Sequence, residues 1–416
     1  MTTVREAVDL VVAGVQRLDD ETVPLREALD RVLAEDVDSP LDLPARTNSA
    51  MDGYAARAAD VRGATREAPK RLRIVEEVHA GRVPTRPLGP GEATRIFTGA
   101  PVPEGADGVV RQEDTERAGD AVLVLDDRDA GRNLRFAGED LQRGARLLDA
   151  GTLLGPAQIG VLSSIARATV RVPKRARVGI LGSGDEIADL DEAEAILAGT
   201  KIASSNSYTL DALVRRAGAA PVPLGIARDR LEDVRERLAR GFATCDLVVS
   251  SAGVSVGEHD FLHAALESLG MRRVFWKVRM RPGSPLAFGT VGDVPWIGLP
   301  GNPVSTMVCF ELFVRPAIRK MQGHAALHRR TIPVMTEERL TTGGRLTYFL
   351  RAVVHEERGA WRAHLTGPQG SGILTSMARA NALLIVPEDR SEVPAGEILP
   401  AIPLDDGWPA ALKPPV

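Results

Sequence analysis

Small residues and acids follow three apolar runs in the second half of the chain, in turns that could hold an anion. The segments are GSGDE (182–186), AGVSVGEHD (252–260) and LPGNPVS (299–305). Small residues let backbone N–H groups approach a ligand closely, and a helix N-terminus favours an anion. Acids such as Glu258 and Asp260 would repel that anion unless a metal ion stood between them. The turns by themselves leave open whether an anion is bound here together with a cation, and one such turn alone is most often structural.

A row of cations follows the second turn, in FWKVRMRPG (275–283). In a strand, Lys277, Arg279 and Arg281 would point to one face, because side chains alternate between the two faces. Three cations in a row would suit phosphate or another oxyanion. The alternative is a solvated strand face.

Other familiar sites are not supported by the spacing. Neither GxGxxG nor GxxxxGK[ST] occurs, so a dinucleotide fold and a P-loop are not indicated. HDFLH places His259 and His263 one helical turn apart, but with no clear third ligand it is interpreted as an ordinary helix face. Cys245 and Cys309 lie inside apolar runs and are predicted to be buried thiols.

Composition gives the broad class of protein. The chain has 416 residues, with Lys+Arg 52 against Asp+Glu 56 and a formal net charge of -4. This balance argues against a protein that coats nucleic acid. The N-terminus lacks the apolar core of a signal peptide, and no run approaches the ~18 apolar residues of a membrane span. We expect a soluble cytoplasmic protein of two or more domains.

The elements that must position these residues change in character along the chain. Helices are predicted over residues 3–15 and 24–34, followed by short strands and Gly/Pro-rich turns to about residue 143 and a helix that begins at Pro156. Strands and helices then alternate, which predicts a largely parallel sheet whose carboxyl edge forms the binding crevice. After about His324 only strands and turns are expected.

Nine motifs in a fixed order make the chain similar to a known family. They are NSAMDGYA, RIFTGAPVPEGAD, GEDL, GSGDE, SNSY, AGVSVGEHDF, FWKVRMRPGSPLAFG, LPGNPVS and QGSG, and the resemblance around them extends from about residue 3 to 404. The chain resembles the molybdopterin molybdenumtransferase (MoeA) family and the similar E domain of gephyrin and plant molybdenum insertases.

The resemblance implies an α/β multidomain fold. It comprises an elongated helical dimerisation domain (1–45 and 144–173), an inserted β-rich domain (46–143), a molybdopterin-binding α/β domain with a mainly parallel sheet (174–324) and a C-terminal β-barrel (325–416).

It also implies a reaction. Family members insert molybdenum from molybdate into adenylylated molybdopterin, release AMP and require Mg²⁺. The acids of the turns would then share Mg²⁺ with substrate phosphate. The implied partners are a second copy of the chain and, in transient contact, a molybdopterin adenylyltransferase and acceptor molybdoenzymes. Neither nucleic acid nor a membrane is expected as a partner.

Site residues are implied position by position. The catalytic set is Asp52, Thr98, Asp140 and Glu186, with Glu186 and Asp140 also as metal ligands. The substrate-binding set is Gly182, Ser183, Asp229, Ser255, Gly257, Asp260, Lys277, Arg281, Pro300, Gly301 and Asn302. Arg351 and Ser371 would bind molybdate. Ala252, Arg281 and Ser284 depart from the family pattern, which has Gly, Lys and a frequent Lys there.

Two other functions compete with this one. One is a scaffold, because gephyrin's E domain also clusters receptors, but this chain keeps the catalytic-type acids. The other is a hydrolase that uses the same loops on a pterin or nucleotide phosphate. Retention of molybdenum by the product would separate them.

Overall fold

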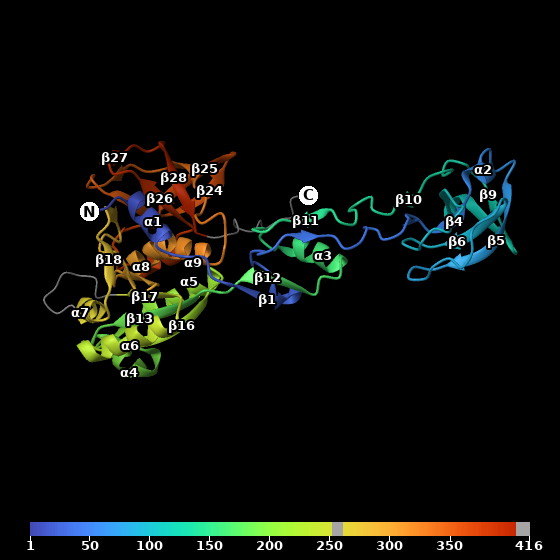
Figure 1. Cartoon of the computed structure of the whole chain (residues 1–416). Coiled ribbons are helices and arrows are strands. Elements are labelled where there is room, and N and C mark those ends of the chain that lie inside the picture. Colours follow the sequence, from blue (N-terminus) through green and yellow to red (C-terminus); the bar gives the residue numbers. More distant parts are fainter. Residues whose placement is uncertain (252–260, 405–416) are drawn as a thin grey trace. The chain divides into compact units, whose positions relative to one another are not determined.

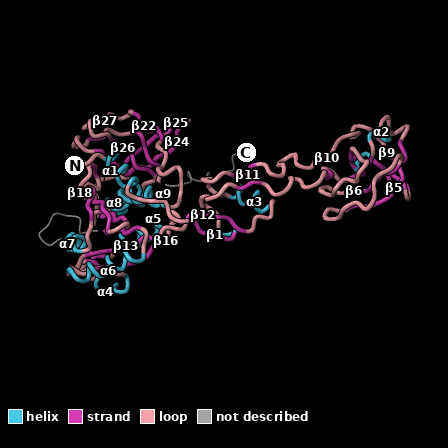
Figure 2. Tube along the Cα trace, in the orientation of Figure 1, coloured by secondary structure: helices cyan, strands magenta, loops and turns pink. Residues whose placement is uncertain are grey.

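The structure is a computed structural model that describes residues 1–251 and 261–404. The chain forms two compact units. The first comprises Met1–Ala34, Leu153–Gly155 and Thr169–Val416, and the second comprises Glu35–Thr152 and Pro156–Ala168. Figure 1 colours them along the sequence, and Figure 2 shows which segments are helix, strand or loop. Each unit is described separately.

A six-stranded sheet in the order β16-β13-β17-β21-β20-β18 organises the first unit. The parallel strands are β13 (Arg177–Ser183), β16 (Ala220–Ala227), β17 (Leu247–Ser251) and β21 (Val294–Leu299). β20 (Ala287–Val291) is antiparallel to β21, and β18 (Arg272–Trp276) is antiparallel to β20, so β18 runs in the same direction as the parallel strands. β17 is buried along its whole length, as expected for a strand covered on both faces. The predicted, largely parallel sheet is confirmed.

Helices pack on both faces of this sheet. Leu210 of α5 (Ser205–Arg216) joins one core with Val178, and Leu238 of α6 (Leu231–Thr244) joins another with Leu181. Val178 and Leu181 are an odd number of residues apart on β13, so they face opposite sides. Smaller elements are β14 (Ile187–Ala188), η3 (Leu190–Glu192), α4 (Ala193–Leu197), β15 (Ile202–Ala203) and α7 (Phe261–Ser268).

The helix predicted after LPGNPVS is present but not uniform. It runs through α8 (Pro303–Cys309), a π-helical turn (Phe310–Val314) and α9 (Arg315–Met321). Proline lacks an N–H, and inside a helix its ring clashes with a carbonyl one turn earlier. The widened turn directly before Pro316 accommodates this residue.

The N-terminal segment confirms one predicted helix and not the other. α1 (Val4–Ala13) has a capping box, in which Glu6 N–H donates to Thr3 Oγ1 at 3.2 Å and Thr3 N–H donates to Glu6 Oε2 at 2.9 Å. The helix predicted over residues 24–34 is wrong. Asp20–Pro24 is strand β1, paired antiparallel with β12 (Thr169–Pro173), and only Leu25–Glu27 is helical, as a 3-10 turn. Pairing with a distant strand outweighed the local signal of Pro24.

A closed barrel of five strands forms the C-terminal part of the first unit. Its strands are β22 (Ile332–Thr336), β24 (Thr347–Glu357), β25 (Ala360–Leu365), β26 (Ala382–Val386) and β28 (Ile398–Pro403). The ring closes because β24 pairs with both β25 and β26. Short strands β19 (Met280–Arg281), β23 (Leu340–Thr341) and β27 (Glu392–Val393) accompany it. Helix α10 (Leu374–Arg379) was not expected there.

The second unit is β-rich, as predicted. Its sheet has the order β7-β4-β6-β5-β9-β8. The bounds are β4 (Gly53–Ala56), β5 (Lys70–Val78), β6 (Glu92–Ile96), β7 (Gly108–Arg111), β8 (Thr115–Ala118) and β9 (Ala121–Val124). Also present are β2 (Val37–Asp38) with β11 (Arg146–Leu148), β3 (Asn48–Ser49) with β10 (Leu134–Arg135), η2 (Gln112–Asp114), α2 (Ala58–Val61) and α3 (Pro156–Ser164).

The fold class predicted from the resemblance is therefore confirmed, while the bounds of its four domains stay predictions. Every helix within the described residues is too short or too polar to cross a bilayer. Both cysteines are free and buried, as predicted, and burial raises the pKa of the Cys245 and Cys309 thiols.

Candidate functional site

The GSGDE turn leaves β13 at the carboxyl edge of the parallel sheet and folds tightly on itself. Gly184 has φ +129, and a Cβ there would lie 2.6 Å from the Glu186 carboxylate oxygens. Only glycine fits this turn, because its conformation and the returning Glu186 side chain exclude a larger residue. A Cβ on Gly182 would lie 3.3 Å from Ser207 Oγ, so the start of α5 packs closely against the same turn.

Two acids join the turns that follow β13 and β16. The N–H of Asp185 donates to Asp229 Oδ2 at 3.3 Å, and the N–H of Asp229 donates to Asp185 Oδ1 at 3.3 Å. The Nζ of Lys201 donates to the Asp185 carbonyl. Asp185, Glu186 and Asp229 are all exposed, so this edge presents carboxylate oxygens to solvent. Asp185 was not among the predicted site residues, although it lies inside the GSGDE motif.

Asn206, at the start of α5, faces the same edge with one atom unsatisfied. Its Nδ2 donates to the Gly301 carbonyl at 2.7 Å, which brings the SNSY motif beside the LPGNPVS turn. Its Oδ1 is buried and accepts no hydrogen bond from the described residues. Buried polar atoms are nearly always paired, so this carbonyl is suited to a donor on a ligand. The SNSY motif signalled Asn206 in the sequence, but no role was predicted for it.

The LPGNPVS turn is held from inside and from the barrel. Asn302 and Pro303 occupy the N-cap and first helical position, as predicted, although the Asn302 side chain makes no capping hydrogen bond. Thr306 Oγ1 donates to the Pro300 carbonyl at 2.6 Å. The Val304 N–H donates to the carbonyl of Ser371 at 3.1 Å, so the QGSG loop of the barrel meets this helix start.

Arg351 fixes that QGSG loop. Its side chain is fully buried, and its guanidinium donates to Ser376 Oγ at 2.9 Å, to the Gln369 carbonyl at 3.1 Å and to the Pro368 and Gly370 carbonyls at 3.2 and 2.9 Å. The planar fork of arginine suits such convergent acceptors. Arg351 thus positions the loop that carries Ser371, and direct contact of either residue with molybdate stays a prediction.

The row of cations in FWKVRMRPG is interrupted. β18 ends at Trp276, Lys277 has φ 114, and only Met280–Arg281 resumes a strand, so the prediction of one continuous strand is wrong. Alternation of exposure nevertheless survives, because Lys277 and Arg281 are exposed while Val278 and Met280 are buried. Arg279 forms an ion pair with Glu388 of the barrel at 3.4 Å. Lys277 and Arg281 therefore remain the cations suited to an anionic substrate.

Asp52 and Thr98 lie together in the second unit. Thr98 donates to Asp52 Oδ1 from its N–H at 2.8 Å and from its Oγ1 at 2.7 Å. Both hydrogen bonds hold the pKa of the Asp52 carboxyl below its usual range, and the bond from the backbone N–H has the larger effect. Asp140 lies on another loop of this unit, where its N–H donates to the Leu43 carbonyl at 3.0 Å and its side chain is exposed.

The remaining predicted residues are placed as follows. Ser183 ends β13, and Gly301 and Pro300 lie in the turn described above. Ser255, Gly257, Asp260 and Ala252 lie outside the described residues. The metal pair Glu186 and Asp140 is divided between the two units, so its joint role stays a prediction.

Comparisons with known proteins cover nearly the whole chain. The MoeA N-terminal region (domain I and II) matches residues 2–166, a probable molybdopterin binding domain matches 179–320, and the MoeA C-terminal region (domain IV) matches 334–404. A Nostoc protein named molybdopterin molybdenumtransferase is 37% identical over 406 residues, which is 95% of this chain and 92% of the relative. The chain belongs to the MoeA family of molybdopterin molybdenumtransferases.

Further relatives agree with this assignment. The molybdopterin molybdenumtransferase of Bacillus subtilis is 37% identical over 92% of this chain and 90% of its own. The crystal structure of the molybdopterin biosynthesis moeA protein from Pyrococcus horikoshii OT3 has a TM-score of 0.80 and 31% identity, and the match covers 97% of this chain and 100% of that one. In this MoeA-family chain, the region that matches the probable molybdopterin binding domain contains Asp185, Asn206 and Asp229.

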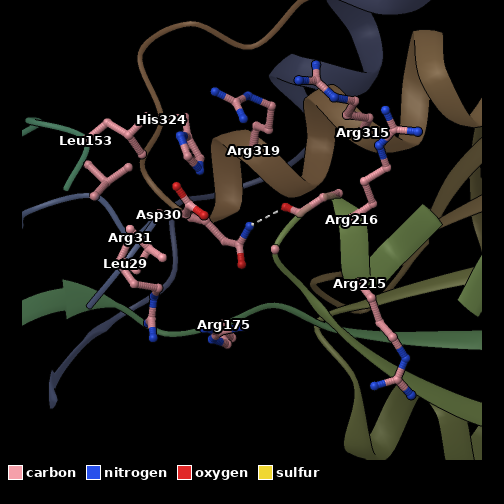
Figure 3. A pocket seen from close by; sticks show the side chains of 14 residues that line it. Leu29, Asp30, Arg31, Leu153, Arg175, Arg215, Arg216, Arg315, Arg319 and His324 are labelled. Carbon is pink, nitrogen blue, oxygen red and sulfur yellow. Dashed lines mark hydrogen bonds between the residues drawn. The ribbon is translucent and has the colours of Figure 1, made fainter. Parts of the chain in front are cut away.

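The opposite edge of the sheet holds a large basic cavity (Figure 3). Its volume is about 540 Å³, and it is lined by Arg31, Arg175, Arg215, Arg216, Arg315 and Arg319 among others. Burial and the nearby Arg319 and Arg315 lower the pKa of His324 to about 4, so this ring is neutral at pH 7. None of the predicted site residues lines this cavity.

Proposed function

We propose that this MoeA-family transferase inserts molybdenum from molybdate into adenylylated molybdopterin, with release of AMP and with a requirement for Mg²⁺. The observation that carries the proposal is the carboxyl edge of β13 and β16. There, exposed carboxylates of Asp185, Glu186 and Asp229 flank a glycine turn, and Asn206 Oδ1 has no hydrogen-bond partner among the residues that the structure describes. The names of the relatives support the choice of pterin substrate and metal.

The donor set at this edge fits Mg²⁺. Mg²⁺ prefers oxygen ligands and is usually held by one or two carboxylates, water and substrate phosphate. The carboxylates of Asp185 and Asp229 each accept a hydrogen bond from the backbone N–H of the other residue, so the two carboxylates lie close together. The Glu186 side chain folds back over the same turn. Bound Mg²⁺ would supply the positive charge that lets phosphate approach these acids. Asp140 is the further ligand that the family pattern predicts.

The chain's own groups account for binding and orientation of the substrate. The Asn206 carbonyl can accept a hydrogen bond from an N–H of a pterin ring, which would satisfy this buried acceptor. Lys277 and Arg281 are exposed cations that can pair with phosphate. Asp52, fixed by Thr98 and kept ionised, can orient a hydroxyl or water but would not serve as an acid near pH 7.

For molybdate, we propose that Ser371 contacts the oxyanion and that Arg351 acts mainly through the loop. The Arg351 guanidinium already donates to three backbone carbonyls and one hydroxyl, all within residues 368–376. Its positive charge still lowers the energy of an anion near the loop.

A homodimer with C₂ symmetry is part of the proposal, because closed two-fold assemblies are the commonest oligomers. Transient contacts with a molybdopterin adenylyltransferase and with acceptor molybdoenzymes would deliver substrate and remove product. Light scattering that gives only the mass of a single 44.5 kDa chain at micromolar concentration would contradict the dimer.

A coupled assay tests the reaction. The full chain is mixed with adenylylated molybdopterin, molybdate and Mg²⁺, and both AMP and molybdenum bound to the pterin are measured. We expect both to appear together and only with Mg²⁺. AMP without molybdenum in the product would indicate a hydrolase, and neither product would indicate a binding protein such as a scaffold.

A further inference from the structure

Three side chains of the C-terminal barrel converge on one point of its surface, and none of them is among the predicted site residues. His355 lies on β24, His364 lies on β25, and Glu337 directly follows β22. One ligand atom of each lies within 4.8 Å of the ligand atoms of the other two. Among the described residues, this is the only group of three or more potential ligands so placed.

Strand register explains the convergence. In the antiparallel pair, Val353 is opposite His364 and His355 is opposite Arg362, so the two histidines are diagonal neighbours on one face. In the parallel pair, Thr336 is aligned with Ala363, and the Glu337 N–H donates to the Ala363 carbonyl at 2.9 Å. Glu337 therefore continues the register beside His364. The closed barrel holds all three backbones, so the ligand set exists before any ion arrives.

The distances match a small divalent ion. Glu337 Oε1 lies 3.6 Å from His355 Nε2, and Glu337 Oε2 lies 3.3 Å from His364 Nδ1. A tetrahedral zinc ion with bonds of ~2.0–2.2 Å separates neighbouring ligand atoms by about 3.3–3.6 Å. Each of these two nitrogen–oxygen distances falls in that range, with each imidazole facing a different oxygen of the one carboxylate. The side chains are 32–49% exposed, so an ion and its water can reach them. Arg362, opposite His355, is paired with Glu357 at 2.8 Å, which offsets its repulsion of a cation.

We propose that Glu337, His355 and His364 form a site for Zn²⁺ or a divalent transition ion of similar preference. Two histidines and one carboxylate are a known zinc ligand set, and they leave a fourth position for water or an external ligand. Imidazole ligands favour zinc, copper, nickel or iron over magnesium, so this site is chemically distinct from the Mg²⁺ site of the proposed function. Bound metal would cross-link β24, β25 and the end of β22.

Single histidine–glutamate pairs elsewhere in the chain serve as controls. His79 lies 3.1 Å from Glu77, and His263 lies 3.0 Å from Glu267. Each pair offers one imidazole and one carboxylate. A metal preference that depends on two imidazoles should therefore be absent from these pairs and present at the barrel.

Calorimetry on the full chain tests the site. EDTA-treated protein is titrated with ZnCl₂, and we expect one saturable ion per chain in the micromolar range or tighter. The double variant His355→Gln, His364→Gln should bind at least ~10-fold more weakly, while His79→Gln should bind like the wild type. Zn²⁺ should raise the melting temperature of the wild type and of His79→Gln but not that of the double variant. Co²⁺ should give visible d–d absorption in the wild type alone.

Equal melting temperatures in EDTA would show that the double variant is folded, and Glu337→Gln replaces it should it fail to fold. Absence of saturable Zn²⁺ binding up to about 100 µM, or equal binding by the wild type and the double variant, would overturn the site. The double variant should keep wild-type AMP release with Mg²⁺. Loss of Zn²⁺ binding with normal AMP release would therefore leave the proposed function intact, and failure of AMP formation would leave the zinc result intact.

Discussion

The two edges of the parallel sheet carry opposite charges and use them differently. At the carboxyl edge, the three acids Asp185, Glu186 and Asp229 are exposed, and the Asn206 amide oxygen has no hydrogen-bond partner within residues 1–251 and 261–404. At the opposite edge, six arginine side chains line one cavity. Yet many of its guanidinium groups already donate to the chain.

Hydrogen bonds show the difference. Arg216 donates to the Leu404 carbonyl at 2.7 Å, Arg319 to the Ala326 carbonyl at 2.9 Å and Arg315 to the Leu327 carbonyl at 3.2 Å. These arginines bind backbone carbonyls of the segment between α9 and β22 and of the residue that follows β28. The density of charged side chains is therefore a poor indicator of a ligand-binding site. Whether the charged groups already have hydrogen-bond partners within the protein is a better indicator.

The largest expected effect concerns the cations near the carboxyl edge. Replacing both Lys277 and Arg281 with Gln should weaken binding of adenylylated molybdopterin by about 3–6 kcal/mol, or ~1.5–3 for each charge-assisted contact. The melting temperature should stay nearly constant because both side chains are exposed. Titration calorimetry measures the affinity. Arg279→Gln is the matched control, since Arg279 is paired with Glu388. Unchanged affinity in the double variant would show that Lys277 and Arg281 are solvent-exposed side chains that do not bind the substrate.

Arg351→Met should cost about 2–4 kcal/mol of unfolding free energy. It would leave the backbone carbonyls of the Pro368–Gly370 loop without the donor that the buried guanidinium supplies. Urea unfolding measures the loss. Arg379→Met, on the exposed side of α10, should stay within about 0.5 kcal/mol of the wild type. Equal stability of the two variants would refute the role of Arg351 in fixing the loop.

Glu186→Gln removes one charge from the acidic edge and keeps the size of the side chain. AMP release should fall at least ~10-fold, equivalent to about 1.4 kcal/mol, and the affinity for Mg²⁺ should fall with it. The melting temperature should be unchanged, because the side chain is exposed. Glu194→Gln, an exposed acid on α4, is the control. Wild-type Mg²⁺ dependence in a folded Glu186→Gln variant would exclude Glu186 as a ligand.

The smallest effect tests the basic cavity. His324 has a folded pKa of about 4, below the ~6.5 of an unfolded chain, so the unfolded state binds more protons as the pH falls. Its contribution is present above pH ~6.5 and is lost as the pH falls toward 4. Relative to His324→Asn, the wild type should lose about 1–2 kcal/mol between pH 7 and pH 4, after allowance for partial exposure. If the free energies of unfolding of the two proteins change with pH in parallel, the His324 ring is not shielded from solvent.

Local features were within reach of the sequence. The alternation of strands and helices, the capping box of Thr3 and Glu6, the burial of both cysteines and the N-cap position of Asn302 follow from neighbouring residues, and the structure has all of them. The ordered motifs likewise identified the family, because they are themselves runs of adjacent residues. Several of the predicted site residues, such as Gly182 and Asp229, lie at or just after strand ends, where the pattern placed them.

Contacts between distant segments were decided by the tertiary structure alone. Pairing with β12 placed Pro24 at the end of a strand instead of at the start of a helix. Strand register brought Asp185 to Asp229 and placed Glu337 beside His364. The guanidinium of the buried Arg351 donates hydrogen bonds to a loop 17 to 19 residues further along the chain. Such contacts depend on which strands pair and in what register. Their free energy comes from groups far apart in the chain, so no local run of residues encodes them.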